Sequence, residues 1–173
     1  MAVADMKNIK PMTVLDAEIG VGKKDRSAEV ALLNKDLADL HVLYTKTHNY
    51  HWNVTGPQFY SLHKLLEEQY EALAESIDAV AERVRQLDGF AVGTMAEYLE
   101  LARLKEEAPG NFPSASDMVA NLVNDHEAVI RQLRKDIDET ANQHDDATTS
   151  DFLTGLAEAH EKMAWMLRAF LES

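Results

Sequence analysis

The sequence predicts an all-α protein that forms one four-helix bundle, with a short extra helix between the second and third long helices. Its 173 residues are rich in Ala, Leu, Glu and Lys, which are strong helix formers, and 46% of them are hydrophobic, enough for one core. Only seven glycines and four prolines are present, too few to separate many short strands. Four long stretches repeat apolar residues at steps of three and four, the spacing of one helix face.

Two amphipathic stretches make up the first half of the predicted bundle. One stripe runs from Val30 to His51, and the next runs from Phe59 to Val84. The dipeptide 56–57 between them is Gly-Pro, which ends one helix and allows another to start. We therefore expect two long helices joined by a tight connection.

Local capping signals divide the second half. Thr94 and Glu97 have the spacing of a capping box, which opens a short helix. After a turn-rich segment, Ser114 or Ser116 would cap the third long helix. An acidic linker at 145–146 then leads into the last long helix.

The N-terminal residues differ from the rest in pattern and in charge. Residues 1–26 show no sustained apolar period, so we expect a flexible arm there, followed by a bundle domain of residues 27–173. The arm carries five basic and four acidic groups, whereas the whole chain has a net charge of −13. The body is therefore acidic, which argues against a phosphate-gripping surface on it.

Other absences narrow the expected location and chemistry. The chain has no cysteine, which excludes disulfides and thiolate metal sites. It has no apolar signal segment and no run long enough to cross a bilayer, so no membrane association is expected. We expect a cytoplasmic protein.

A candidate metal site lies on one face of the second long helix. His63, Glu67, Asp78 and Glu82 fall at roughly 0°, 40°, 60° and 100° around its axis. His63 and Asp78 are about 22 Å apart along the axis, too far to hold one ion. The second helices of two subunits could lie antiparallel across a two-fold axis. The His63 end of one helix would then meet the Asp78 end of the other, so every site would be shared between two subunits. His51, just before the tight connection, can lean toward the His63 end.

The ligand types suit several divalent metals. Imidazole and carboxylate without sulfur fit Fe(II), and also accept Zn(II), Mn(II) or Co(II). The alternative for each residue taken alone is ordinary: an exposed acid on a solvated face, or a histidine hydrogen-bonded in the core. Five such residues converging on complementary ends favour the metal interpretation.

These residues lie in a recognisable pattern. The run from Lys46 to His63, KTHNYHWNVTGPQFYSLH, together with Glu67-x-x-Tyr70 and the segment from Asp78 to Arg83, closely resembles the signature of the Dps family of mini-ferritins. The C-terminal segment 160–168 is also similar to the last helix of that family. The resemblance covers about residue 27 to the end of the chain.

The resemblance implies a ferritin-like fold assembled into a hollow dodecamer, with two ferroxidase sites at each dimer interface. His51, His63 and Glu67 would come from one subunit, and Asp78 and Glu82 from its partner. Many members have Asp at the position of Glu67, so the longer side chain leaves the second metal position open.

The implied activity is oxidation of Fe(II), with hydrogen peroxide preferred over oxygen, and storage of ferric mineral in the cage, which protects DNA from oxidative damage. Trp52 would donate an electron when a single iron reacts, or alternatively pack at an interface. His48 would be a supplementary ligand or would support a ligand through a hydrogen bond, with an ordinary surface histidine as the alternative.

Iron entry is expected at acidic pores near the start of the last helix. Asp145, Asp146 and Asp151 lie where the family builds its three-fold pores, and rings of carboxylates concentrate cations. We select Asp146 and Asp151 over Asp145. The alternative is that these acids simply stabilise a helix N-terminus.

Rival functions are weaker or differ in kind. A ferritin with its di-iron centre inside one bundle needs inward Glu-x-x-His motifs, and the sequence has none. Neither His126-Glu127 nor His160-Glu161 continues to the second histidine of a metalloprotease, so both histidines are expected to be packing residues. The serious rival is a nucleoid-associated protein with little iron chemistry, which binds DNA through many weakly basic arms on one cage.

Overall fold

The computed structural model of the chain describes residues 17–172, and this range contains five helices and no strand. The long helices are α1 (Lys23–Asn53), α2 (Phe59–Gln86), α4 (Ala115–Asn142) and α5 (Ala147–Arg168), and the short one is α3 (Met95–Leu101). The prediction of an all-α bundle with a short helix between the second and third long helices is confirmed.

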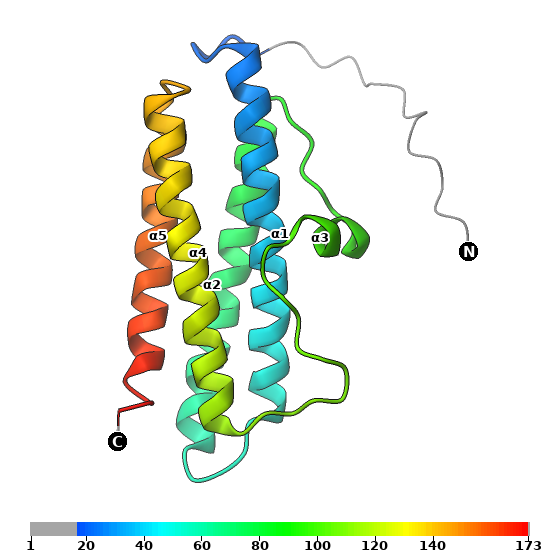
Figure 1. The fold of residues 1–173 in the computed structure, drawn as a ribbon, viewed down its shortest axis with the longest axis vertical. Coiled ribbons are helices and arrows are strands. Elements are labelled where there is room, and N and C mark those ends of the chain that lie inside the picture. Colours follow the sequence, from blue (N-terminus) through cyan, green and yellow to red (C-terminus); the bar gives the residue numbers. More distant parts are fainter. Residues whose placement is uncertain (1–16, 173) are drawn as a thin grey trace, which may run out of the picture.

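The long helices associate as two hairpins (Figure 1). α1 packs along α2, α4 packs along α5, and contacts of α1 with α4 and of α2 with α5 join the hairpins. α2 and α4 run in the same direction, so the connection between them must return along the bundle. α3 lies in this crossover and packs against α1, which is the arrangement of a four-helix bundle with one long crossover.

The first helix begins earlier than the apolar pattern indicates. α1 starts at Lys23, four residues before Ser27, because its first turn is held by polar tertiary contacts rather than by an apolar stripe. Arg26 is buried, donates to the carbonyl of Val21 at 2.8 Å and lies 3.6 Å from a carboxylate oxygen of Asp88. The predicted arm boundary at residue 26 therefore falls inside α1, and residues 1–16 of that arm lie outside the described part of the chain.

The core follows the predicted stripes, with one clear exception. Leu33, Leu37, Leu66 and Leu122 are at most 1% exposed and form part of one continuous apolar cluster. Phe59, which the pattern placed inside, is 45% exposed at the first position of α2. A helix end projects beyond its neighbours, so the stripe overestimates burial there.

Both predicted capping signals operate in the described chain. Thr94 and Glu97 form a complete capping box at the start of α3. Ser114, rather than Ser116, caps α4 by accepting from the backbone N–H of Asp117. These bonds satisfy backbone donors that each helix would otherwise leave unpaired.

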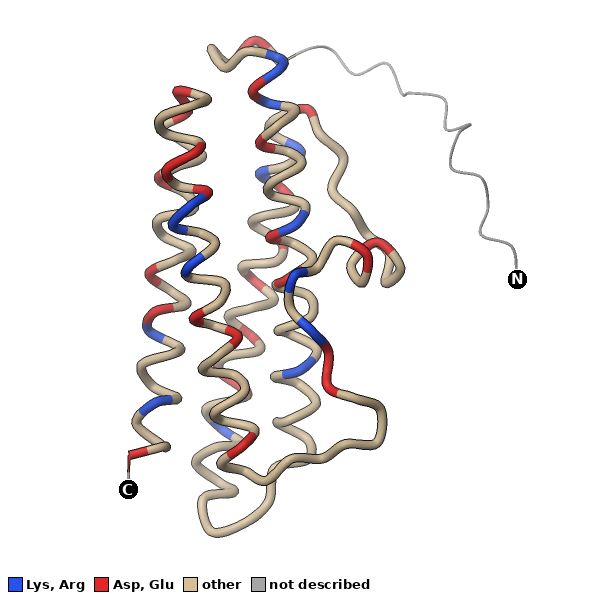
Figure 2. Tube along the Cα trace, in the orientation of Figure 1, with Lys and Arg blue, Asp and Glu red and all other residues tan. Residues whose placement is uncertain are grey.

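Charged residues are distributed over the whole bundle. Figure 2 shows acidic residues along every long helix, as a net charge of −13 requires. Across residues 17–172 no helix combines the length and the apolar character needed to span a bilayer.

Candidate metal centre

Two of the predicted ligands, His51 and His63, form a stacked pair. Their ring centroids are 3.8 Å apart and the rings are 17° from parallel. Nδ1 of His51 lies 2.8 Å from the carbonyl oxygen of His63, and Nδ1 of His63 lies 2.9 Å from the carbonyl oxygen of His51. A carbonyl only accepts, so both Nδ1 atoms must carry hydrogen, and each neutral ring keeps a lone pair on Nε2. The pair can therefore provide two Nε2 atoms as metal ligands.

The turn between α1 and α2 creates this reciprocal contact. α1 ends at Asn53, α2 starts at Phe59, and Gly56 between them adopts φ 108°, a conformation that favours glycine. The short connection brings the last turn of α1 beside the first turn of α2. His51 is buried and His63 is half-buried, so the rings are fixed yet remain near the surface.

Glu67 stands one turn after His63 and is held by a neighbouring charge. Lys64 Nζ lies 2.5 Å from Glu67 Oε2, and Lys64 is itself half exposed. The hydrogen bond from Lys64 lowers the pKa of Glu67, desolvation opposes this effect, and the charge of Lys64 adds to it. Glu67 is therefore an ionised carboxylate near the histidine pair, and metal binding would require it to release Lys64.

Asp78 and Glu82 lie farther along α2, and both are exposed. They share the helix face predicted for them but remain about 22 Å or more from His63 along the axis. Within the described residues, no three His, Asp or Glu side chains gather closely enough to hold a metal ion. One chain thus brings His51 and His63 together, but it does not bring Asp78 and Glu82 to them.

The sequence-predicted residues His48 and Trp52 belong to an aromatic stack. The His48 ring lies between Trp52, at 4.1 Å, and Tyr70, at 4.2 Å, measured between centroids. Desolvation is the main effect that lowers the pKa of His48. His48 is 6.2 Å from His51 by centroid, and Trp52 is 66% exposed. The stack places His48 beside the ligand pair with both ring faces covered.

Tyr70 is a site residue that the stripe pattern concealed. It lies within the apolar stripe predicted from Phe59 to Val84, and its ring packs edge-on against His51 at 5.1 Å. Phe59 stacks on His63 at 5.1 Å on the other side of the pair. Two aromatic rings therefore flank the histidines and limit their movement. The signal that could have identified Tyr70 is its position seven residues after His63, two turns along the same face.

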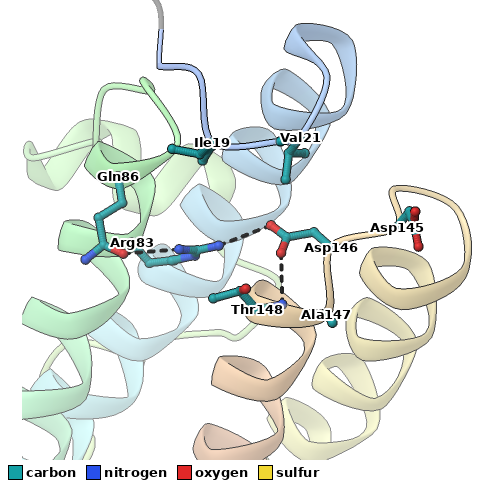
Figure 3. A pocket seen from close by; sticks show the side chains of 9 residues that line it. Ile19, Val21, Arg83, Gln86, Asp145, Asp146, Ala147 and Thr148 are labelled. Atoms are coloured by element: carbon teal, nitrogen blue, oxygen red, sulfur yellow. Dashed lines mark hydrogen bonds and ion pairs between the residues drawn. The ribbon is translucent and has the colours of Figure 1, made fainter.

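Asp146, one of the predicted pore residues, is buried and bonded within the chain. Its side chain is 3% exposed and caps α5 by accepting from the N–H groups of Thr148 at 2.9 Å and Thr149 at 3.1 Å. Arg83 Nη2 also lies 3.1 Å from Asp146 Oδ2. Figure 3 marks this contact with a dashed line. Burial raises the pKa of Asp146, but hydrogen bonds from Thr149 and the charge of Arg83 outweigh that effect and lower it. Asp146 therefore stabilises the N-terminus of α5, as the alternative predicted.

Asp145 and Asp151 are the acids at this end that remain exposed. Asp145 adopts φ 53° in the turn before α5, and Figure 3 shows it apart from the Arg83 and Asp146 pair. A pocket of about 610 Å³ opens here between the segment 19–21, α2 and the start of α5. The pore assignment of Asp146 and Asp151 stays a prediction, and the exposure of Asp145 makes it a further candidate.

His126 and His160, which were expected to be packing residues, form a second histidine pair in the core. Both are 0% exposed, and their Nδ1 atoms lie 2.9 Å apart between α4 and α5. Neither Nε2 has a hydrogen-bond partner. Burial lowers the pKa of His160 to about 4, and burial together with the neighbouring His160 lowers the pKa of His126 well below its usual value.

Comparisons with known proteins agree on the kind of protein this chain resembles. A family model described as a ferritin-like domain matches residues 30–173. A low temperature-induced protein of Nostoc sp. is 56% identical over 154 residues, which cover 89% of this chain and 86% of that protein. The DNA protection during starvation protein 2 of Bacillus anthracis is 46% identical, covering 82% and 95%.

A solved structure extends the likeness to three dimensions. The crystal structure of the Dps protein from Vibrio cholerae O1, described as a member of a broad superfamily of ferritin-like diiron-carboxylate proteins, superposes with a TM-score of 0.85. Its sequence is 28% identical, and the match covers 94% of this chain and all of that one. The likeness therefore spans nearly the whole chain.

Proposed function

The chain belongs to the Dps family of ferritin-like proteins, and from this premise we propose that it binds and oxidises Fe(II) at sites shared between two subunits. The observation that carries the proposal is the reciprocal bonding of His51 and His63 through Nδ1, which leaves the two Nε2 atoms as ring positions for a ligand at the end of a helix face that bears carboxylates. In the core pair His126 and His160, by contrast, the Nδ1 atom of one ring accepts from the Nδ1 atom of the other.

A second copy completes the ligand set. With two α2 helices antiparallel across a two-fold axis, His51, His63 and Glu67 of one subunit meet the partner subunit's Asp78 and Glu82. The exposure of Asp78 and Glu82 in the single chain supports this arrangement, since unpaired carboxylates are then available to a neighbour. Each dimer would hold two such sites.

The ligand set suits oxidation of iron as a substrate. Carboxylates compensate the charge of Fe(II) and of the Fe(III) product, and neutral imidazoles complete the coordination. Two Fe(II) ions supply two electrons, and hydrogen peroxide with two protons accepts them to give two water molecules, so no hydroxyl radical is released. Hydrogen peroxide is the proposed oxidant, with oxygen the slower alternative. Zinc would bind the same ligands without undergoing oxidation and should inhibit.

Assembly and storage are the remaining parts of the proposal. Twelve subunits would enclose a cavity in which ferric mineral grows, and iron would enter near Asp151 at the start of α5. The exposed Trp52 supports either electron donation or packing between subunits. The stack that encloses His48 favours a role in positioning His51 over direct ligation. DNA binding through the arm, and a cytoplasmic or nucleoid-associated location, remain predictions from the sequence.

Reassembly of two inactive variants tests the shared site. H51A/H63A and D78A/E82A should each lose fast iron oxidation, because each change removes half of every site. A dimer containing one subunit of each variant has one complete site and one with neither half. Mixed cages should therefore recover part of the wild-type activity, whereas each variant reassembled alone should recover none.

Mass spectrometry of the mixed cages is the necessary control. If mixing is confirmed and oxidation does not return, the ligands belong to one subunit and the shared site is wrong. Oxidation by a stable monomer would refute it equally. Anaerobic Fe(II) titration of each variant should also show fewer bound ions than in the wild type.

A further inference from the structure

Two buried polar side chains of α2 reach across to α5, one toward each end of the proposed ligand face. Gln69 is 3% exposed, and its Nε2 donates to the carbonyl oxygen of Met163 at 3.2 Å. Arg83 is also buried, and its guanidinium bonds to Thr149 and Asp146 at the start of α5. Each side chain therefore ties α2 to the opposite helix hairpin.

The tie at Arg83 consists of several directional bonds. Its Nε lies 3.2 Å and its Nη2 lies 2.8 Å from Oγ1 of Thr149, and Nη2 also lies 3.1 Å from Oδ2 of Asp146. Nη1 lies 3.2 Å from Oε1 of Gln86, the next contact along α2 (Figure 3). Thr149 can donate its one hydroxyl hydrogen to Asp146 Oδ2 at 2.7 Å or to Glu29 Oε2 at 3.0 Å. The network thus connects α2 with both α5 and α1.

Apolar packing constrains this side of α2 less closely. The helix packs along α1, whereas its contacts with α5 are sparse. Val80 and Val84 are 0% exposed and hold α2 against the core, but apolar contacts are not directional. A rotation of α2 by about 10° would move a carboxylate roughly 6 Å from its axis by about 1 Å. Directional bonds to α5 oppose such a rotation.

The proposed ligands lie close to these two ties along the chain. Asp78 and Glu82 are both exposed, so the backbone of α2 sets where each carboxylate lies. Glu82 directly precedes Arg83, so that tie holds the part of α2 that carries the carboxylate half of the site. Gln69 lies two residues after Glu67 and holds the part that carries the histidine half.

We propose that Arg83 and Gln69 are positioning residues for the shared site, Arg83 for its carboxylate half and Gln69 for its histidine half. This inference rests on the proposed sharing of ligands between two subunits. Misplacing a reacting group by about 1 Å can cost about 100-fold in rate, even though no ligand is removed. Because the two halves of one site come from different subunits, loss of one tie should slow only those sites to which its own subunit gives the corresponding half.

Reassembly of inactive subunits can assign each tie to one half of the site. In the mixed cage of H51A/H63A and D78A/E82A, the H51A/H63A subunit supplies the carboxylates of the one complete site. R83K added to that subunit should lower the recovered rate of Fe(II) oxidation by about tenfold, because Lys keeps the charge but lacks the fork of donors. The same change in the D78A/E82A subunit should leave the recovered rate unchanged.

Q69M should give the opposite pattern, because Met fills a similar volume but cannot donate to α5. Added to the D78A/E82A subunit, which supplies the histidines of the complete site, it should slow the recovered oxidation several-fold. Added to the H51A/H63A subunit, it should have no effect. A purely structural role of either residue would slow oxidation equally in both placements.

R85K is the matched control, because Arg85 is exposed and its guanidinium lies 4.7 Å from the ring centroid of Phe90. It should cause no loss in either subunit. If R83K prevents assembly, T149V removes the hydroxyl to which Arg83 donates but keeps Asp146, and it should show the same asymmetry. Equal losses in both placements, or no loss in either, would overturn the positioning roles alone. Failure of the parent mixture to recover would overturn the shared site and the positioning roles with it.

Discussion

The molecule contains two histidine pairs with opposite uses. His51 and His63 stack face to face near the surface, and each Nδ1 bonds to a backbone carbonyl. His126 and His160 lie in the core and bond to each other through Nδ1. In the first pair both ring lone pairs remain on free Nε2 atoms. In the second pair, one ring's lone pair accepts the other ring's hydrogen.

The difference shows that the partner of Nδ1 decides what a histidine can do. A carbonyl partner fixes the tautomer and leaves a ligand atom, whereas an imidazole partner consumes a lone pair. Burial then separates the pairs further, because desolvation opposes protonation of the core pair. Spacing along a helix cannot distinguish these two cases.

The largest expected effect is loss of activity without loss of fold at the surface pair. H51A/H63A should reduce the rate of Fe(II) oxidation by at least about 100-fold, because both imidazole ligands are removed. The matched variant H126A/H160A, assayed below its melting temperature, should oxidise iron at nearly the wild-type rate. Stopped-flow oxidation with peroxide measures the rate in both variants. Equal loss of rate in the two variants would contradict a catalytic role specific to the surface pair.

Stability should respond in the reverse order. H160A should lower the free energy of unfolding by about 2 to 4 kcal/mol, because it opens a core cavity and leaves His126 Nδ1 unpaired. H63A, at a half-buried position, should cost clearly less. Chemical denaturation of the two variants makes the comparison, with cage assembly checked by size-exclusion chromatography. A larger loss for H63A would contradict the assignment of the core pair to packing.

Lowering the pH should destabilise the fold through the core histidine pair. Burial lowers the pKa of His160 from 6.5 to about 4. Between pH 6.5 and pH 4, this histidine is therefore protonated in the unfolded chain but not in the folded chain. This contribution to stability is present above pH 6.5 and is lost as the pH falls toward 4, on the order of 3 kcal/mol. H126L/H160L should flatten the difference in thermal unfolding between pH 7 and pH 4.5. An unchanged pH profile would show that other groups control acid unfolding.

The smallest expected effect concerns the carboxylate beside the surface pair. K64A should free Glu67 from its ion pair and raise the apparent affinity for Fe(II) by less than about fivefold, since exposed ion pairs are worth at most about 1 kcal/mol. K135A, which removes another exposed lysine, serves as the control for net charge. Anaerobic Fe(II) titration compares them, and an equal gain in both would assign the effect to charge alone.

The helix pattern identified most of the fold and part of the site. Caps at Thr94 and Ser114 follow from local hydrogen bonding, so short sequence signals were sufficient. The start of α1 was missed because Arg26 is held by contacts with Val21 and Asp88, and the latter lies far along the chain. Periodicity records which residues are apolar and cannot detect a helix turn held by charged groups.

Some site residues were likewise predictable from the sequence, whereas the roles of others depended on tertiary contacts. His51, His63, Glu67, Asp78 and Glu82 were selected because helix geometry alone places them on connected faces. The role of Asp146 depended on whether Arg83, 63 positions away, would reach it, and the structure shows that it does. Tyr70 was missed because an aromatic residue in a stripe looks the same whether it packs in the core or against a ligand.

By itself the sequence determined the helices, their polar and apolar faces and the types of ligand, because these depend on neighbours within about two turns. Only the tertiary structure decided which polar groups meet across helices. It placed Arg103 among three carboxylates, Asp146 on Arg83, and His126 against His160. Such contacts arise from residues tens of positions apart, and their ionisation and hydrogen bonding depend on burial, which is a property of the packed bundle rather than of any segment.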